Sequence, residues 1–75
     1  MQGHNEALAR YNRAIELDPG DALANAARGL VYRTMQRYDE ALADFNRAIE
    51  LDPGDARAIA ERGETCRLMQ GTTRR

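Results

Sequence analysis

The chain has 75 residues, of which 11 are Lys or Arg and 12 are Asp or Glu, so its formal net charge is −1. This length allows one small folding unit, the near-neutral charge offers no basic surface for nucleic acid, and the longest apolar run is too short to span a membrane. A single cysteine forms no internal disulfide, and the N-terminus does not resemble a signal peptide, so we expect a soluble cytoplasmic domain.

The first helix is expected at about residues 5–17, with Asn5 as its N-cap. Its apolar side chains follow the spacing of one helical face. They are Ala7, Leu8, Tyr11, Ala14 and Ile15. The helix ends before Pro19, which cannot continue it, and residues 18–21 read as a turn.

The second helix is expected at about residues 22–35 and carries apolar residues on two sides. One side holds Ala24, Ala27, Val31 and Met35, and the other holds Leu23, Ala26 and Leu30. A helix that is apolar on two sides is packed on two sides, and Gly29 allows a neighbouring helix to approach closely.

The third helix is expected at about residues 39–51 and, after a short connection, lies antiparallel to the second. Its apolar face lies opposite a polar side that is formed by Glu40, Asp44, Arg47 and Glu50. Pro53 ends the third helix as Pro19 ends the first. The fourth helix is expected at about residues 56–70, with Gly71 as a left-handed terminator and residues 72–75 as a frayed tail.

The chain repeats itself with a period of 34 residues, because residues 6–21 recur as residues 40–55. The two segments differ at only two positions, where Asp44 replaces Arg10 and Phe45 replaces Tyr11. A fixed period of this length, with the turn residues repeated as well, predicts a solenoid of helix pairs.

These residues resemble the tetratricopeptide repeat family, whose unit is a pair of antiparallel helices, A and B. The family's characteristic positions are filled by Gly29, Tyr32, Ala41, Phe45, Ala48 and Pro53. The resemblance implies an all-α fold of antiparallel helix-turn-helix repeats that form a short right-handed superhelical solenoid. The four helices follow the order B-A-B-A, so one full repeat at residues 22–55 is flanked by two half repeats in a single domain, residues 1–75.

Several positions depart from the family pattern. Asn25 and Ile59 stand where Trp is common, and Arg28 and Arg62 stand where Leu is common. We expect Arg28 to lie along apolar surface with its charged head in water. Cys66 replaces the aromatic residue of helix A, and we expect it to be a small buried apolar side chain.

We expect no catalytic, cofactor or metal site. His4 is the only histidine and Cys66 the only cysteine, so the chain has too few ligands for a zinc site and no evident base beside the thiol. The aspartates of the two turns are expected to cap helices rather than bind calcium.

The resemblance implies that the A helices line a groove that takes a peptide. The candidate groove residues are Leu23, Ala26, Ala27, Leu30, Arg33, Thr34, Arg57, Ala60, Glu61, Glu64, Arg67 and Leu68. Because acidic side chains are included, a clamp for a terminal carboxylate is disfavoured. Leu23 and Leu30 either contact a ligand or are covered by a neighbouring chain. The predicted function is a non-enzymatic protein–protein interaction scaffold, with a protein or peptide partner.

The alternative function is a structural self-assembly module, an excised or engineered part of a longer array, since residues 1–3 match residues 69–71. The chain begins with a helix B and closes with a helix A, so each end is expected to expose an apolar face and form homo-oligomers. The candidate self-association residues are Leu8, Tyr11, Ile15, Ile59, Cys66 and Met69. A ring, a filament and a two-fold dimer all remain open.

Overall fold

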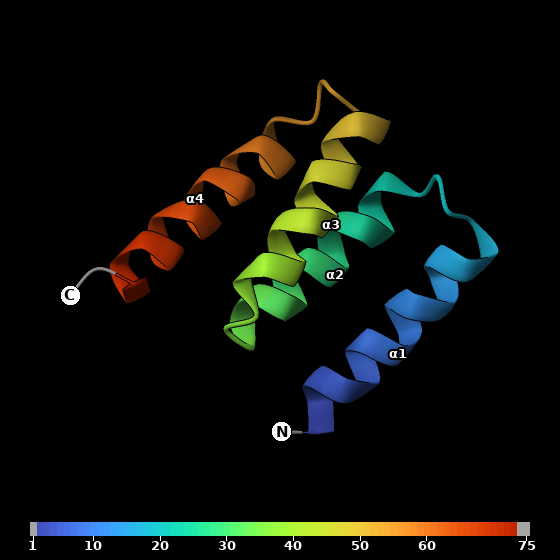
Figure 1. Cartoon of the computed structure of the whole chain (residues 1–75). Coiled ribbons are helices and arrows are strands. Elements are labelled where there is room, and N and C mark those ends of the chain that lie inside the picture. The colour runs from blue at the N-terminus through green and yellow to red at the C-terminus, as the bar shows by residue number, and fades with distance from the viewer. Residues whose placement is uncertain (1, 74–75) are drawn as a thin grey trace.

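The computed structural model describes residues 2–73, which form four α-helices and, within that range, no strand (Figure 1). The helices are α1 (Gln2–Leu17), α2 (Ala22–Thr34), α3 (Tyr38–Leu51) and α4 (Ala56–Thr73). Short turns that contain Pro19 and Pro53 join α1 to α2 and α3 to α4, so consecutive helices run antiparallel. The predicted all-α fold of repeated helix pairs is confirmed.

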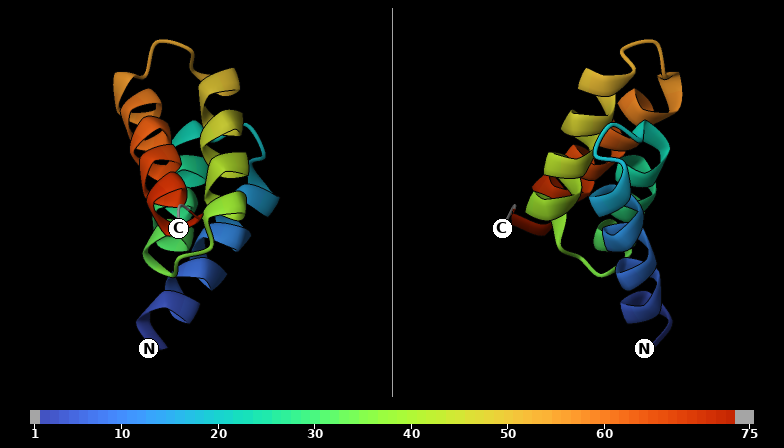
Figure 2. Two further views of the ribbon diagram at one scale, coloured as in Figure 1. Left: turned by 60° about the vertical axis from the view of Figure 1, so that its left-hand side comes forward. Right: turned by 90° about the vertical axis from the view of Figure 1, so that its right-hand side faces the viewer.

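The helices pack in chain order, each against the one before it (Figures 1 and 2). Contacts join α1 to α2, α2 to α3 and α3 to α4, with a smaller contact between α2 and α4. The packed helices form a thin body of 41 × 33 × 14 Å. As a result α2 and α3 lie in the interior, whereas α1 and α4 each have a side on which no described helix packs.

Local interactions set the ends of the inner helices. Asp21 caps α2, because its carboxylate accepts a hydrogen bond of 3.1 Å from the backbone N–H of Ala24. After α2 the chain turns at Gln36, whose φ of 64° is left-handed, and the backbone N–H of Arg37 donates to the carbonyl of Tyr32 at 2.8 Å. This tight connection explains why α3 packs directly against α2.

The outer helices are longer than expected. Helix α1 begins at Gln2, so Asn5 lies inside the helix and the prediction that it is the N-cap is wrong. Helix α4 continues to Thr73, so the predicted end at residue 70 and the left-handed Gly71 are wrong as well. No proline interrupts either segment, and a helical glycine costs only about 0.5–1 kcal/mol. Residues 74 and 75 of the expected tail lie outside the described residues.

The core is small and is centred on Phe45 of α3, whose side chain is fully buried. The other buried apolar residues are Ala24, Ala41, Ala48 and Ala58. Gly29 of α2 lies directly over the ring, because a Cβ at this position would be 3.0 Å from Cε1 of Phe45. Glycine is therefore required here for the close approach of α2 and α3.

Asp44 lies buried in the α2–α3 interface, although the helical pattern sets it on the polar side of this helix. Its side chain is 7% exposed and accepts two hydrogen bonds from Arg28, from Nε at 2.8 Å and from Nη2 at 2.7 Å. The Arg28 head is thus paired rather than in open water, and its Nη1 donates to Oδ1 of Asn12 on α1 at 2.8 Å. The hydrogen bonds to Asp44 raise the pKa of Arg28, against the opposing effect of its burial.

Candidate functional site

An apolar hollow of about 310 Å³ lies between α2 and α4. It is lined by Leu23, Ala26, Ala27, Leu30, Phe45, Asp55, Arg57, Ala58 and Glu61. Leu23 is 64% exposed and Leu30 is 36% exposed, although both are apolar. The hollow therefore has a wall of small alanines, a rim of exposed leucines and a few polar groups at the start of α4.

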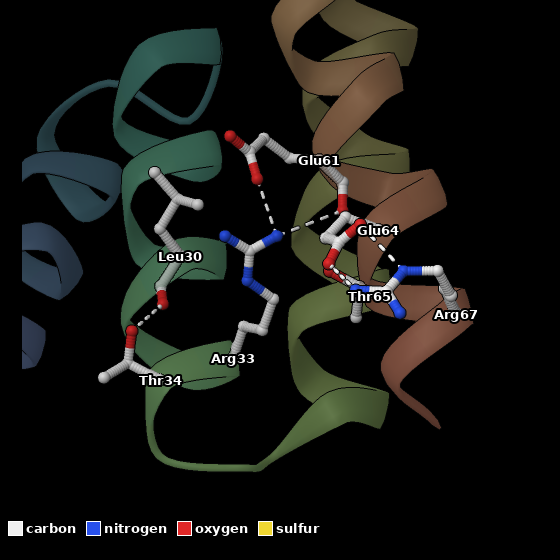
Figure 3. A network of polar contacts seen from close by, with 7 residues as sticks. All are labelled: Leu30, Arg33, Thr34, Glu61, Glu64, Thr65 and Arg67. Carbon is white, nitrogen blue, oxygen red and sulfur yellow. Dashed lines mark hydrogen bonds and ion pairs between the residues drawn. The ribbon is translucent and has the colours of Figure 1, made fainter. Parts of the chain in front are cut away.

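An ion pair crosses from α2 to α4 at this site (Figure 3). Nη1 of Arg33 lies 2.6 Å from Oε1 of Glu61 and also donates to the Glu61 backbone carbonyl at 3.4 Å. The hydroxyl of buried Thr65 donates to the same carbonyl at 2.7 Å. This network holds the two walls of the hollow together and partly neutralises the charge of Glu61.

Six of the twelve predicted groove residues line the hollow, namely Leu23, Ala26, Ala27, Leu30, Arg57 and Glu61. The other six do not line it, although Arg33 reaches its wall by pairing with Glu61. The Thr34 hydroxyl donates to the Leu30 carbonyl at 2.9 Å, and Glu64 pairs with Arg67 on α4. Ala60 is exposed, and Leu68 is half-buried.

Three lining residues were missed by the sequence argument, namely Phe45, Asp55 and Ala58. Phe45 was assigned to the core, and its ring also reaches the hollow from α3. Asp55 precedes α4, and its carboxylate accepts a hydrogen bond of 2.9 Å from the backbone N–H of Arg57. The sequence contains a signal for Asp55. An aspartate that caps the fourth helix must lie next to the first turn of α4, and that turn borders the hollow.

The predicted self-association residues lie on the two outer helices. Leu8, Tyr11 and Ile15 of α1 are half-buried, and so is Met69 of α4. Ile59 is 44% exposed. Cys66 is an exposed free thiol, so the prediction that it is buried is wrong, because no described helix packs over its side of α4.

The described residues contain no group of three or more side chains arranged to hold a metal ion. Among the same residues, no helix combines the length and the apolar character needed to cross a bilayer.

Two family models match the chain, one described as Tetratricopeptide repeat over residues 22–55 and one described as TPR repeat over residues 3–36. No curated protein is significantly similar to the chain. The two matched ranges overlap on α2 and together cover residues 3–55, including the turns at Pro19 and Pro53. With the helix pairs and the packing of Phe45 against Gly29, these matches show that the chain belongs to the tetratricopeptide repeat family.

Proposed function

We propose that this protein is a non-enzymatic interaction scaffold that binds a segment of a partner protein in the hollow between α2 and α4. Tetratricopeptide repeats generally mediate protein–protein interactions. The observation that carries the proposal is the exposure of Leu23 and Leu30 beside an apolar hollow of about 310 Å³. Concave apolar sites with a few polar groups at the rim are typical binding sites.

The chemistry of the hollow defines the partner segment. Its wall of alanines accepts an apolar side chain, and Leu23 and Leu30 extend the contact along α2. Arg57 is the basic residue of the lining, and Asp55 lies 3.8 Å from its Nε, so a terminal carboxylate has no cluster of cations to bind. An amphipathic segment with apolar residues spaced along one helical face fits best.

The test uses a library of random 12-residue peptides displayed on phage and selected on the full chain. We expect the selected peptides to carry apolar residues at i and i+3 or i+4. The double variant Leu23→Asp, Leu30→Asp should then weaken binding at least about tenfold, because two charges would enter the apolar contact.

The matched control is Leu17→Asp, since Leu17 is 71% exposed but does not line the hollow. We expect Leu17→Asp to bind the selected peptides like the parent chain. Equal binding by the Leu23→Asp, Leu30→Asp variant, with its helical circular dichroism unchanged, would show that the hollow is not the binding site.

Self-assembly through the outer helices is the second candidate, and the exposure of Ile59 on α4 favours it. In that case light scattering of the parent chain should show a mass that rises with concentration, and Ile59→Asp or Leu8→Asp should return it to the monomer value. A well-folded monomer at high micromolar concentration excludes this function.

We also propose that the protein is cytoplasmic, since an exposed thiol such as Cys66 stays reduced in a reducing compartment.

A further inference from the structure

Four residues form one side of α4, which we call the open face: Ile59, Arg62, Gly63 and Cys66. They follow the i, i+3, i+4, i+7 spacing of a single helical face. Ile59 is 44% exposed, Gly63 and Cys66 are exposed, and Arg62 is half-buried. A Cβ at Gly63 would meet nothing within 4 Å. This face is distinct from the hollow, whose α4 residues are Arg57, Ala58 and Glu61.

The chain contains its own reference for the arginine and glycine of this surface, because the equivalent pair of α2, 34 positions earlier, is covered by α3. There Arg28 binds the carboxylate of Asp44 through two hydrogen bonds, of 2.7 and 2.8 Å. Gly29 receives the ring of Phe45, with its Cε1 and Cζ at 3.0 and 3.1 Å from a Cβ built on the glycine. An arginine followed by glycine on a helix A thus receives an aspartate followed by an aromatic residue on the next helix B.

The open face presents the same arrangement without its partner. Nη1 of Arg62 donates to Oδ1 of Asn46 on α3 at 2.9 Å, as Nη1 of Arg28 donates to Asn12 on α1 at 2.8 Å. Both guanidinium groups are therefore anchored in the same way to the preceding helix. Within residues 2–73, however, no carboxylate forms an ion pair with Arg62.

We propose that the open face of α4 binds an amphipathic helix of another protein that carries an acidic residue directly followed by an aromatic residue. The acidic side chain pairs with Arg62, and the aromatic ring packs over Gly63. In α3 the matching positions are Asp44 and Phe45, with Ala41 four residues before the ring and Ala48 three residues after it. The recognised pattern is therefore Ala-x-x-Asp-Phe-x-x-Ala, with a bidentate arginine–carboxylate pair as its polar determinant.

The same geometry disfavours a second copy of this chain as the occupant. In a head-to-tail stack, α1 would take the position that α3 takes on α2. The residue of α1 that aligns with Asp44 is Arg10, which would face Arg62 with the same charge. Like charges brought together in an interface suppress the wrong partner. The predicted stacking of α4 on α1 is therefore opposed by the contact of Arg62 with Arg10, whereas the apolar residues of the two helices are compatible with it.

The test compares two fluorescent peptides taken from the chain itself, residues 38–52 and residues 4–18. They have the same length and differ at four positions, including Asp44 against Arg10 and Phe45 against Tyr11. We expect fluorescence anisotropy with the full chain to show at least about tenfold tighter binding of the peptide 38–52. Replacing Asp44 by Arg within that peptide should abolish the advantage, and this change leaves the protein untouched.

Two changes in the protein complete the experiment. Arg62→Glu should weaken binding of the peptide 38–52 and restore binding of its version with Asp44→Arg, a reversal that a general loss of structure would not produce. Gly63→Leu should weaken both peptides by filling the place of the ring. The proposal is overturned by equal binding of the two parent peptides, by tighter binding of residues 4–18, or by retained binding of the peptide 38–52 to Arg62→Glu.

An independent measurement uses Arg10→Asp in the full chain. This substitution supplies the missing carboxylate. At the same concentration, we therefore expect the variant to associate head to tail more strongly than the parent chain. Adding Arg62→Glu should reverse the effect. If Arg10→Asp leaves the mass measured by light scattering unchanged, Arg62 does not select the partner of this face.

Discussion

Gly29 and Gly63 occupy the same position of the repeat, yet their surroundings are opposite. A Cβ on Gly29 would lie 3.0 Å from the ring of Phe45, whereas a Cβ on Gly63 would meet no atom within 4 Å. The arginine beside each glycine shows the same contrast, because Arg28 binds Asp44 and Arg62 has no carboxylate partner among the described residues. The interior α2–α3 interface and the open face of α4 thus share one arginine–glycine pair, which has its partner in the first and lacks it among the described residues in the second.

The contrast teaches that the repeated motif encodes an interface rather than the burial of particular residues. The A helices carry the arginine–glycine half, and the aspartate–aromatic half belongs to a B helix. Where both halves are present they make a close-packed core, and where one is missing the same residues become exposed surface. Stability and docking in such a stack are therefore related properties of the same contacts.

Removing the ring from the interior interface should have the largest effect. Phe45→Ala empties a fully buried site and should cost about 3–5 kcal/mol. A unit of this size has a stability of about 3–5 kcal/mol, so the variant should be largely unfolded. Tyr11→Ala, at the equivalent but half-buried position of α1, should cost clearly less. Urea titrations followed by circular dichroism measure both, and equal costs would contradict the difference between the two regions.

Breaking the buried ion pair should rank second. Asp44→Ala leaves the Arg28 guanidinium without its carboxylate in a partly buried site, and we expect a loss of about 1–3 kcal/mol. Glu50→Ala is the matched control on the same helix, because the Arg47–Glu50 pair is solvent-exposed and should contribute about 0–1 kcal/mol. Urea titrations that give the same loss for both variants would show that the α2–α3 pair has no special role.

The two glycines should respond in opposite directions. Gly29→Ala places a methyl group against the Phe45 ring, and overpacking of about 1–3 kcal/mol exceeds the roughly 0.5–1 kcal/mol gained in helix propensity. Gly63→Ala meets nothing, so it should stabilise the chain by about 0.5–1 kcal/mol. Thermal melts of the two variants show directly whether each substitution raises or lowers the stability of the chain. A stabilising Gly29→Ala would contradict the close approach of α2 and α3.

The smallest effect concerns a surface pair on α4. Hydrogen bonds from Arg67 lower the pKa of Glu64, and the charges of Arg67 and Arg33 add to this effect. Because the folded-state pKa is depressed, the contribution to stability is present above the unfolded pKa and is lost as the pH falls through the folded pKa. NMR titration should show the low Glu64 midpoint rising in Arg67→Gln, with little change in the melting temperature because the pair is exposed. An unchanged midpoint would contradict the pairing.

Much of the fold was predictable, because it depends on local rules. The 34-residue period, the prolines at residues 19 and 53 and the spacing of apolar residues such as Phe45 place all four helices. The ends were less accurate, as the extension of α4 through Gly71 shows, because no strong terminator decides whether a last turn forms.

Half of the predicted groove residues also line the hollow. Leu23, Leu30, Arg57 and Glu61 were expected there because the family resemblance assigns the groove to the A helices, and the hollow borders that side of α2 and α4. That a ligand binds there stays a prediction. Phe45 was missed as a lining residue, since a ring that fills the core also borders the hollow only once α4 is placed beside α3.

Period and turns alone established that this chain is a stack of antiparallel helices built from one repeated unit. Whether a position of the repeat is buried in a given copy depends on the helix that packs against it, and tertiary packing alone decides which helix that is. Asp44 belongs to the polar side of its helix by spacing and is buried against Arg28, and Cys66 was expected to be buried and is exposed. In both cases the reason is the same: helical spacing orients a side chain, but its partner comes from a different segment.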